Sequence, residues 1–208
     1  MSEITAITPQ VKDKERCSIY VDGRFYCGLK LETAVRYRLQ AGQHVDPAFL
    51  DEIQLENEKA QALDKALTHL SASMKTEQAM RDYLRKKGYV DAVCDYVLEK
   101  LREYKFVDDA QYCEQYVEAA SRSKGPRLIA LELRRRGAAQ EAVEAALSGL
   151  EGEDEAARRV LAKYMRGKPP TRETLAKAYR HLLSKGFGHD AAKDALASLR
   201  EEDEGEEG

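Results

Sequence analysis

Clusters of lysine and arginine are the residues of this sequence whose types and spacing could do chemistry. The densest cluster lies in "KGPRLIALELRRRG" at 124–137, and a similar one lies in "RDYLRKKG" at 81–88. Positive side chains gathered on one surface attract polyanions such as nucleic acids. The candidate contact residues, with two from a third cluster, are Arg81, Arg85, Lys86, Lys87, Arg122, Lys124, Arg127, Arg134, Arg135, Arg136, Arg180 and Lys185.

Helix stability is an alternative explanation for part of these clusters. Cations in the last turn of a helix complement its dipole and contribute about 0.3–1 kcal/mol each. Three consecutive arginines, Arg134 to Arg136, exceed that need, and basic clusters recur where the predicted repeats stack. The sequence therefore favours a surface that faces a polyanion over simply solvated helix ends.

Other side chains that often perform catalysis are scattered or have a structural explanation. Adjacent Asp108 and Asp109 are interpreted as a helix cap and a carboxylate near the positive helix end. The sequence has no glycine loop of the nucleotide-binding kind and no G-x-S-x-G. It therefore predicts no enzyme, no metal site and no cofactor. The histidines lie in separate segments: His44, His69, His181 and His189.

The cysteines indicate a reducing environment rather than a zinc site. None has C-x-x-C spacing. A two-residue turn at Asp22-Gly23 would place Cys17 opposite Gly28, so the thiols of Cys17 and Cys27 would point to opposite faces of a hairpin. We expect four reduced and mostly buried thiols. They are Cys17, Cys27, Cys94 and Cys113.

The net charge of −3 hides a basic body. The segment "EEDEGEEG" at 201–208 contributes six acids, and the remainder carries +3. Because this segment is so highly charged, we expect it to be disordered. No apolar run approaches the roughly 18 residues that would span a bilayer, and the first residues lack signal-peptide features. A cytoplasmic protein without a membrane segment is expected.

Residues 1–55 predict a small β-rich module with one helix. Short β-branched and aromatic segments surround Asp22-Gly23, a strong two-residue hairpin signal. The following "KLETAVRYRLQAG" has helical spacing and ends at Gly42. The apolar residues expected on one side of this helix are Leu31, Ala34, Val35 and Leu39.

The rest of the chain predicts three tandem three-helix repeats, at 56–104, 105–152 and 153–200. Three similar turns, which we call elbows, join the second helix of each repeat to the third. Apolar columns and glycines recur across these repeats at a step of 49 residues. Stacked units of this kind predict a mainly α protein of nine repeat helices with an elongated, curved body. The aligned positions are Leu84, Leu133 and Leu182, then Gly88, Gly137 and Gly186, then Leu98, Leu147 and Leu196.

Helix signals at the repeat borders agree with this division. In the middle repeat Asp108 can cap the first helix, Pro126 suits the first position of the second, and Gly137 suits its end. In the last repeat Pro169-Pro170-Thr171 opens the second helix and Gly186 ends it.

These residues together resemble the RecX family of recombination regulators. The strongest similarity is "FVDDAQYCEQYVE" at 106–118 followed by "KGPRLIALELRRRG" at 124–137. The segments "KTEQAMRDYLRKKGY" at 75–89 and "HLLSKGF" at 181–187 are similar to the family's first and last elbows. Three departures are Ser73, where arginine is common, the missing second glutamate in 76–80, and Leu183-Ser184, where the other elbows carry bases. They shift the expected main contact to the middle repeat.

The resemblance implies a partner, RecA polymerised on single-stranded DNA. Family members are non-enzymatic modulators that lodge in the filament groove and restrain ATP hydrolysis and strand exchange during recombination and DNA repair, within the SOS response. The chain itself is expected to be a monomer. A helical DNA-binding protein and a peptide-binding adaptor are the alternatives. The helix after each glycine is mostly Ala, Val, Leu and acids, which disfavours a reader of base edges.

Overall fold

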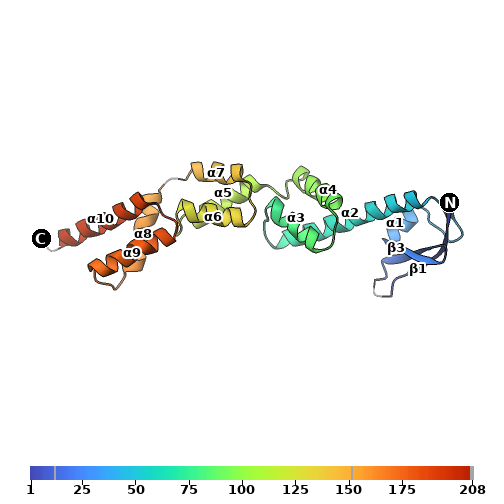
Figure 1. Cartoon of the computed structure of the whole chain (residues 1–208), viewed down its shortest axis with the longest axis horizontal. Helices are drawn as coiled ribbons and strands as arrows, with labels where there is room; N and C mark the ends of the chain where they lie inside the picture. Colours follow the sequence, from blue (N-terminus) through green and yellow to red (C-terminus); the bar gives the residue numbers. More distant parts are fainter. Residues whose placement is uncertain (12, 151, 207–208) are drawn as a thin grey trace. The chain divides into compact units, whose positions relative to one another are not determined.

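The computed structural model describes the backbone of residues 1–11, 13–150 and 152–206, and the side chains of these residues up to Leu199. The chain divides into two compact units (Figure 1). The first unit is Met1–Ser73 with Arg81–Phe106, and the second is Met74–Met80 with Val107–Gly208. The described residues form ten helices and four strands, which confirms the mainly α fold with a β-rich N-terminus. The elongated, curved body stays a prediction.

The N-terminal sheet is antiparallel with strand order β3-β2-β1-β4. The predicted hairpin at Asp22-Gly23 is confirmed, since Val21 pairs with Arg24 and both turn residues have positive φ, 49° and 77°. Two-residue hairpins favour this left-handed geometry because it matches the strand twist. The strands are β1 (Ser2–Pro9), β2 (Arg16–Val21), β3 (Arg24–Lys30) and β4 (His44–Val45).

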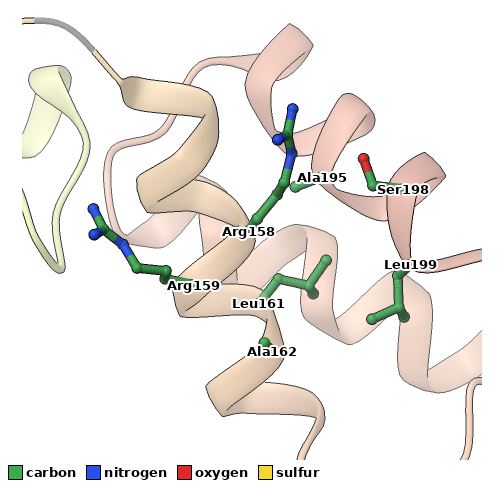
Figure 2. A pocket seen from close by; sticks show the side chains of 7 residues that line it. All are labelled: Arg158, Arg159, Leu161, Ala162, Ala195, Ser198 and Leu199. Carbon is green, nitrogen blue, oxygen red and sulfur yellow. The ribbon is translucent and has the colours of Figure 1, made fainter. Parts of the chain in front are cut away.

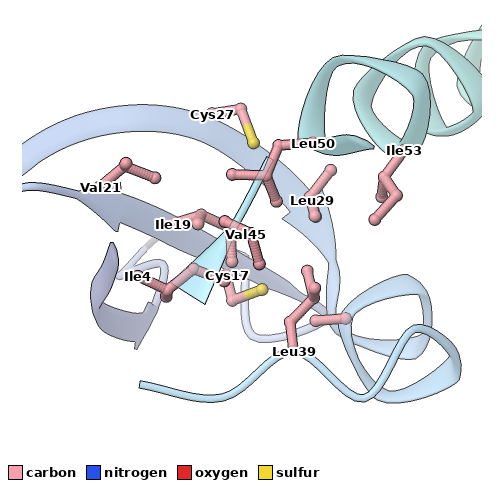
Figure 3. Packing of buried hydrophobic residues seen from close by; sticks show 11 residues of the cluster. Ile4, Cys17, Ile19, Val21, Cys27, Leu29, Leu39, Val45, Leu50 and Ile53 are labelled. Carbon is pink, nitrogen blue, oxygen red and sulfur yellow. The ribbon is translucent and has the colours of Figure 1, made fainter. Parts of the chain in front are cut away.

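A register shift in the hairpin overturns the predicted placement of two thiols. Between Ile19 and Tyr20 the pairing with β3 skips one residue, so Cys17 faces Leu29 rather than Gly28. A bulge of this kind moves every side chain beyond it to the other face of its strand. Cys17 and Cys27 therefore point into the same core (Figure 3). All four cysteines are buried and free, as predicted.

The core of the module closes against a long helix. Helix α2 (Pro47–Ala72) is capped by Asp46 and buries Leu50 and Ile53 against the sheet (Figure 3). Further along α2, the Asn57 side chain accepts a hydrogen bond from Lys30 N at 3.1 Å. This helix begins in predicted module 1–55 and ends at Ala72, within predicted repeat 56–104, so one continuous element crosses that boundary.

The predicted module helix is shorter than expected. Helix α1 spans Leu31–Arg36, and Arg38 beyond it has a φ of +50°. Ala34 and Leu39 are buried as predicted, but Leu31 and Val35 are exposed. The helix ends early because the chain turns at Arg38 to bring Leu39 back to the sheet, which helical spacing does not anticipate.

The repeat region follows the predicted order of three helices per repeat. In the first repeat the C-terminal part of α2 precedes α3 (Glu77–Lys86) and α4 (Asp91–Glu103). The middle repeat contains α5 (Asp109–Ala120), α6 (Pro126–Arg135) and α7 (Gln140–Ser148). The last repeat contains α8 (Glu153–Met165), α9 (Arg172–Ser184) and α10 (His189–Glu206).

Two of the predicted apolar columns differ in burial. Leu84, Leu133 and Leu182 are all fully buried, so this column forms the repeat core. Leu98 is also buried, but Leu147 and Leu196 are only partly covered. In α5, Cys113 and Val117 are buried, whereas Tyr112 and Tyr116 are only partly covered.

The C-terminal helix is longer than predicted. Backbone helix continues to Glu206, whereas the sequence analysis placed a disordered segment from Glu201. Glutamate is a good helix former, so an acidic run can extend an existing helix. The side chains of 200–206 and residues 207–208 lie outside the described part of the chain. None of the described helices combines the length and apolar character needed to cross a membrane.

Candidate functional site

The three elbows share one backbone design. Gly88, Gly137 and Gly186 all lie in the left-handed region, with φ of 90°, 80° and 86°. In each elbow the N–H of the residue after the glycine donates to the carbonyl five residues back, for example Phe187 N to Leu182 O at 3.2 Å. This bond closes a helix end that only glycine enters without strain. The predicted role of these glycines is therefore confirmed.

Within the second unit, the start of α3 packs against the elbow at Gly137. Thr76, only 1 % exposed, caps α3 and donates its hydroxyl to Arg136 O at 2.6 Å. A Cβ at Gly137 would lie 2.7 Å from Gln78 Cβ, closer than side chains approach. Gly137 therefore serves close packing as well as the left-handed turn.

The elbow at Gly186 is likewise in contact with the start of another helix, α6. Gly125 N donates to Lys185 O at 2.9 Å, and Arg127 N donates to Gly186 O at 3.2 Å. A Cβ on Gly186 would overlap the backbone of Leu128. The start of α6 is thus fixed on the third elbow by two main-chain hydrogen bonds.

Asp108 and Asp109 hold helix ends together, which agrees with a structural rather than catalytic function. Asp108 accepts from Gln111 N at 3.0 Å and caps α5 as predicted. Asp109 accepts from Glu77 N at 2.8 Å and from Ala139 N at 3.4 Å, so its carboxylate bridges the starts of α3 and α7. The sequence analysis had assigned Asp109 only to its own helix.

The basic cluster of the middle repeat is divided between internal contacts and solvent. Lys124 donates to both carboxylate oxygens of Glu132 at 2.7 and 2.6 Å, and Tyr116 donates to the same carboxylate. The hydrogen bond to Glu132 raises the pKa of Lys124, and that from Lys124 lowers the pKa of Glu132. Lys124 is therefore already neutralised inside the repeat.

Arg136 belongs to the same internal network. Its guanidinium donates to the Tyr112 hydroxyl at 3.2 Å and lies 4.7 Å from the centre of the Tyr116 ring. The hydrogen bond to Tyr112 raises the pKa of Arg136. Arg136 therefore supports the packing of α5 against α6, which is a role that the sequence analysis did not assign to it.

The remaining predicted residues of this repeat point to solvent. Arg134 donates to the Gln140 side chain at 2.8 Å and is still exposed. Among the described residues, the side chains of Arg122, Arg127 and Arg135 are exposed and make no ion pair or hydrogen bond. These three cations are the ones that can meet an external anion without breaking an internal contact.

The first elbow has fewer free cations than its sequence suggests. Arg81 pairs with Asp95 at 2.6 Å, and Arg85 pairs with Asp91 at 2.8 Å. Lys86 is exposed, and Lys87 lies 5.5 Å from the centre of the Tyr83 ring. These four residues belong to the first unit, whereas the cluster of the middle repeat belongs to the second.

The third elbow contributes to a cavity that sequence analysis missed. Arg180 is exposed and donates to Ala176 O, whereas Lys185 lines a cavity of about 410 Å³. We call this the lysine cavity, and it is lined by Ser123, Val160, Lys163, Tyr164, Lys168, His181 and Lys185. Lys163 and Lys168 stand out in the sequence only as members of a basic run. Their convergence with Ser123 depends on the docking of Gly125 on Lys185.

A smaller cavity of about 230 Å³ lies between α8 and α10. Figure 2 shows that Arg158 extends toward Ala195, while Arg159 points away. Arg159 lies 3.6 Å from Glu155, so part of the charge here is compensated. The two arginines make a useful reference for the lysine cavity because they lie on the same helix as Lys163.

Burial makes the cysteine thiols poor nucleophiles, and the described residues offer no set of metal ligands. Burial raises the pKa of Cys94 and Cys113, and that of Cys27 to about 11, so these thiols stay protonated at neutral pH. Among the described residues, no group of three or more His, Cys, Asp or Glu side chains is arranged to hold a metal ion.

Comparison with known proteins identifies the family. The chain is 31 % identical to regulatory protein RecX of Bacillus licheniformis, covering 100 % of this chain and 81 % of that protein. The chain belongs to the RecX family. It is also 34 % identical to the RecX of Geobacillus thermodenitrificans, over 95 % of this chain and 77 % of that protein. The resemblance noted in the sequence is therefore confirmed.

The RecX domains match the architecture of the chain. Residues 2–46 match the RecX N-terminal domain, and 62–101, 108–147 and 151–196 match the first, second and third RecX three-helix domains. A crystal structure of regulatory protein RecX covers 93 % of this chain with a TM-score of 0.67 and 27 % identity. The first three matched segments lie within the predicted units, and the fourth begins two residues before predicted repeat 153–200. The precise borders stay predictions.

Proposed function

We propose that this RecX-family chain is a non-enzymatic regulator that binds RecA filaments on single-stranded DNA and inhibits their ATPase and strand exchange. The observation that supports it most is the match to all four RecX domains in order. Relatives named regulatory protein RecX support a regulatory role. A cytoplasmic monomer is part of the same proposal.

The exposed cations of the middle repeat are the proposed contact with the filament. Arg122, Arg127 and Arg135 face solvent, and a nucleoprotein filament presents many negative charges. Lys124 and Arg136 are removed from the leading contacts, because they bind Glu132 and Tyr112. The remaining predicted residues of the first and third elbows stay secondary contacts in this proposal.

A co-sedimentation experiment with filaments tests these contacts. The double variant Arg127→Gln, Arg135→Gln should bind RecA filaments on single-stranded DNA at least about tenfold more weakly, because two charge-assisted contacts are lost. The double variant Arg172→Gln, Lys193→Gln removes two exposed charges elsewhere and should bind nearly as well as the wild type. Equal binding by both variants would remove the middle repeat from the interface.

The alternatives lead to different results in the same assay. A helical DNA-binding protein would bind bare DNA as well as filaments and would lose both with the arginine variant. A peptide-binding adaptor would not sediment with filaments at all. Only the proposed function requires RecA on the DNA for full affinity.

A further inference from the structure

The lysine cavity has an unusual charge lining. Lys163, Lys168 and Lys185 surround it, and none of its lining residues is Asp or Glu. Within the described part of the chain, no ion pair joins these lysines to a carboxylate, whereas Lys124 and Lys177 have one each. Like charges around one cavity repel each other, and a bound anion relieves that repulsion.

An aromatic stack forms one part of the lining. The rings of Tyr164 and His181 are stacked with their centres 4.5 Å apart, and the Lys168 ammonium lies 3.4 Å from the centre of the Tyr164 ring. Burial lowers the pKa of His181, and the charges of Lys185 and Lys168 lower it further. Lys185 and Lys168, which contribute to this lowering, both line the cavity.

The cavity is preorganised by the docking of α6 on the third elbow. Lys185 O and Gly186 O accept main-chain hydrogen bonds from Gly125 and Arg127, which fixes the backbone beside Ser123. Tight packing at Gly186 leaves this contact little freedom. A site whose backbone is already fixed loses less entropy when it binds a ligand.

We propose that the lysine cavity is a phosphate-binding site, in which the three ammonium groups and the Ser123 hydroxyl surround one phosphate group. Ammonium groups and a hydroxyl are donors that suit phosphate oxygens. The volume of about 410 Å³ leaves room for more than a phosphate ion, so the phosphate of a single-stranded nucleic acid backbone fits as well as free phosphate. The nucleic-acid form of this site rests on the proposed function, but phosphate binding itself does not.

Nuclear magnetic resonance of the His181 ring tests the site in the full chain. Sodium phosphate, or a short single-stranded oligodeoxynucleotide, is titrated in while sodium chloride keeps the ionic strength constant. We expect saturable shifts of the His181 signals and a rise of its pKa, because the bound anion offsets the lysine charges. Chloride alone at the same ionic strength should leave the signals unchanged.

Two matched variants separate the site from general electrostatics. Lys163→Gln with Lys168→Gln should weaken phosphate binding at least about tenfold, since charge-assisted hydrogen bonds are lost. Arg158→Gln with Arg159→Gln removes the same charge around the smaller cavity and should change affinity less than about twofold. Circular dichroism of both variants checks that the helices are retained.

Each outcome decides the proposal. Saturable binding of phosphate and oligonucleotide, both weakened by the lysine variant, supports a nucleic-acid phosphate site. Binding of phosphate alone supports a site for free phosphate. No saturable shift of His181, or equal weakening by the lysine and arginine variants, would overturn the proposal. None of these outcomes decides whether the chain binds RecA filaments, because the co-sedimentation experiment measures that binding separately.

Discussion

The elbows at Gly88 and Gly186 have the same backbone but different surroundings. Both glycines have φ near 90°, and in both elbows the residue after the glycine donates to the carbonyl five residues back. At Gly186 the start of α6 packs directly on the glycine, whereas an added Cβ at Gly88 would find no atom within 4 Å among the described residues. The same motif therefore ends a helix in one repeat and also forms a packing interface in another.

Leucines below the two elbows should show what the repeats have in common. Leu84 and Leu182 are both fully buried at equivalent positions. Leu84→Ala and Leu182→Ala should each lower the free energy of unfolding by roughly 2–5 kcal/mol, because a buried cavity remains. Chemical denaturation followed by circular dichroism measures this loss. A loss below about 0.5 kcal/mol in either variant would show that its repeat lacks the common core.

Glycine substitutions should then separate the two elbows. Gly88→Ala should cost about 1–2 kcal/mol, which is the strain of a left-handed residue. Gly186→Ala adds the overlap with the backbone of Leu128 and should cost about 1–3 kcal/mol more. Denaturation of the two variants side by side measures the difference. Equal losses would mean that the start of α6 does not pack on the third elbow in solution.

A pH effect at the third elbow should be the smallest. Position 181 corresponds to Tyr83 of the first repeat, two steps of 49 residues earlier. Burial and the nearby lysines lower the pKa of His181 from its ordinary value of 6.5, so the unfolded chain binds the proton first. Wild-type stability should therefore fall as the pH drops through and below 6.5.

The variant His181→Tyr provides the control for this effect. It places the residue of the first repeat at the third elbow and removes the titrating group. Thermal unfolding between about pH 8 and pH 5 should show a smaller loss of stability in the variant than in the wild type. Parallel pH profiles for the two proteins would contradict the assigned environment of His181.

Much of the repeat architecture could be predicted from the sequence because it depends on local signals. Glycine at 88, 137 and 186, proline at 126 and the hairpin at Asp22-Gly23 each specify a backbone geometry directly. The bulge that turns Cys17 toward Cys27 and the early end of α1 could not be predicted in this way. Both are linked to packing in the core of the N-terminal module, which brings together residues distant in sequence.

The candidate site was predicted less well for a related reason. The sequence analysis grouped Arg135 and Arg136 as equivalent contacts. In the structure Arg136 donates a hydrogen bond to Tyr112, whereas Arg135 faces solvent without such a partner among the described residues. Lys163 and Lys168 gained their place beside Ser123 only through contacts between repeats. Whether a cation is available to a partner depends on its neighbours in space, and the sequence lists only its neighbours along the chain.

The ATPase activity of RecA on single-stranded DNA tests the central claim most directly. The purified chain is titrated into RecA that is hydrolysing ATP on a long single strand, and the rate is followed to saturation. We expect the rate to fall progressively with the chain added, while the chain alone hydrolyses no ATP. An unchanged rate at saturating chain, with no co-sedimentation with the filaments, would contradict the proposed function.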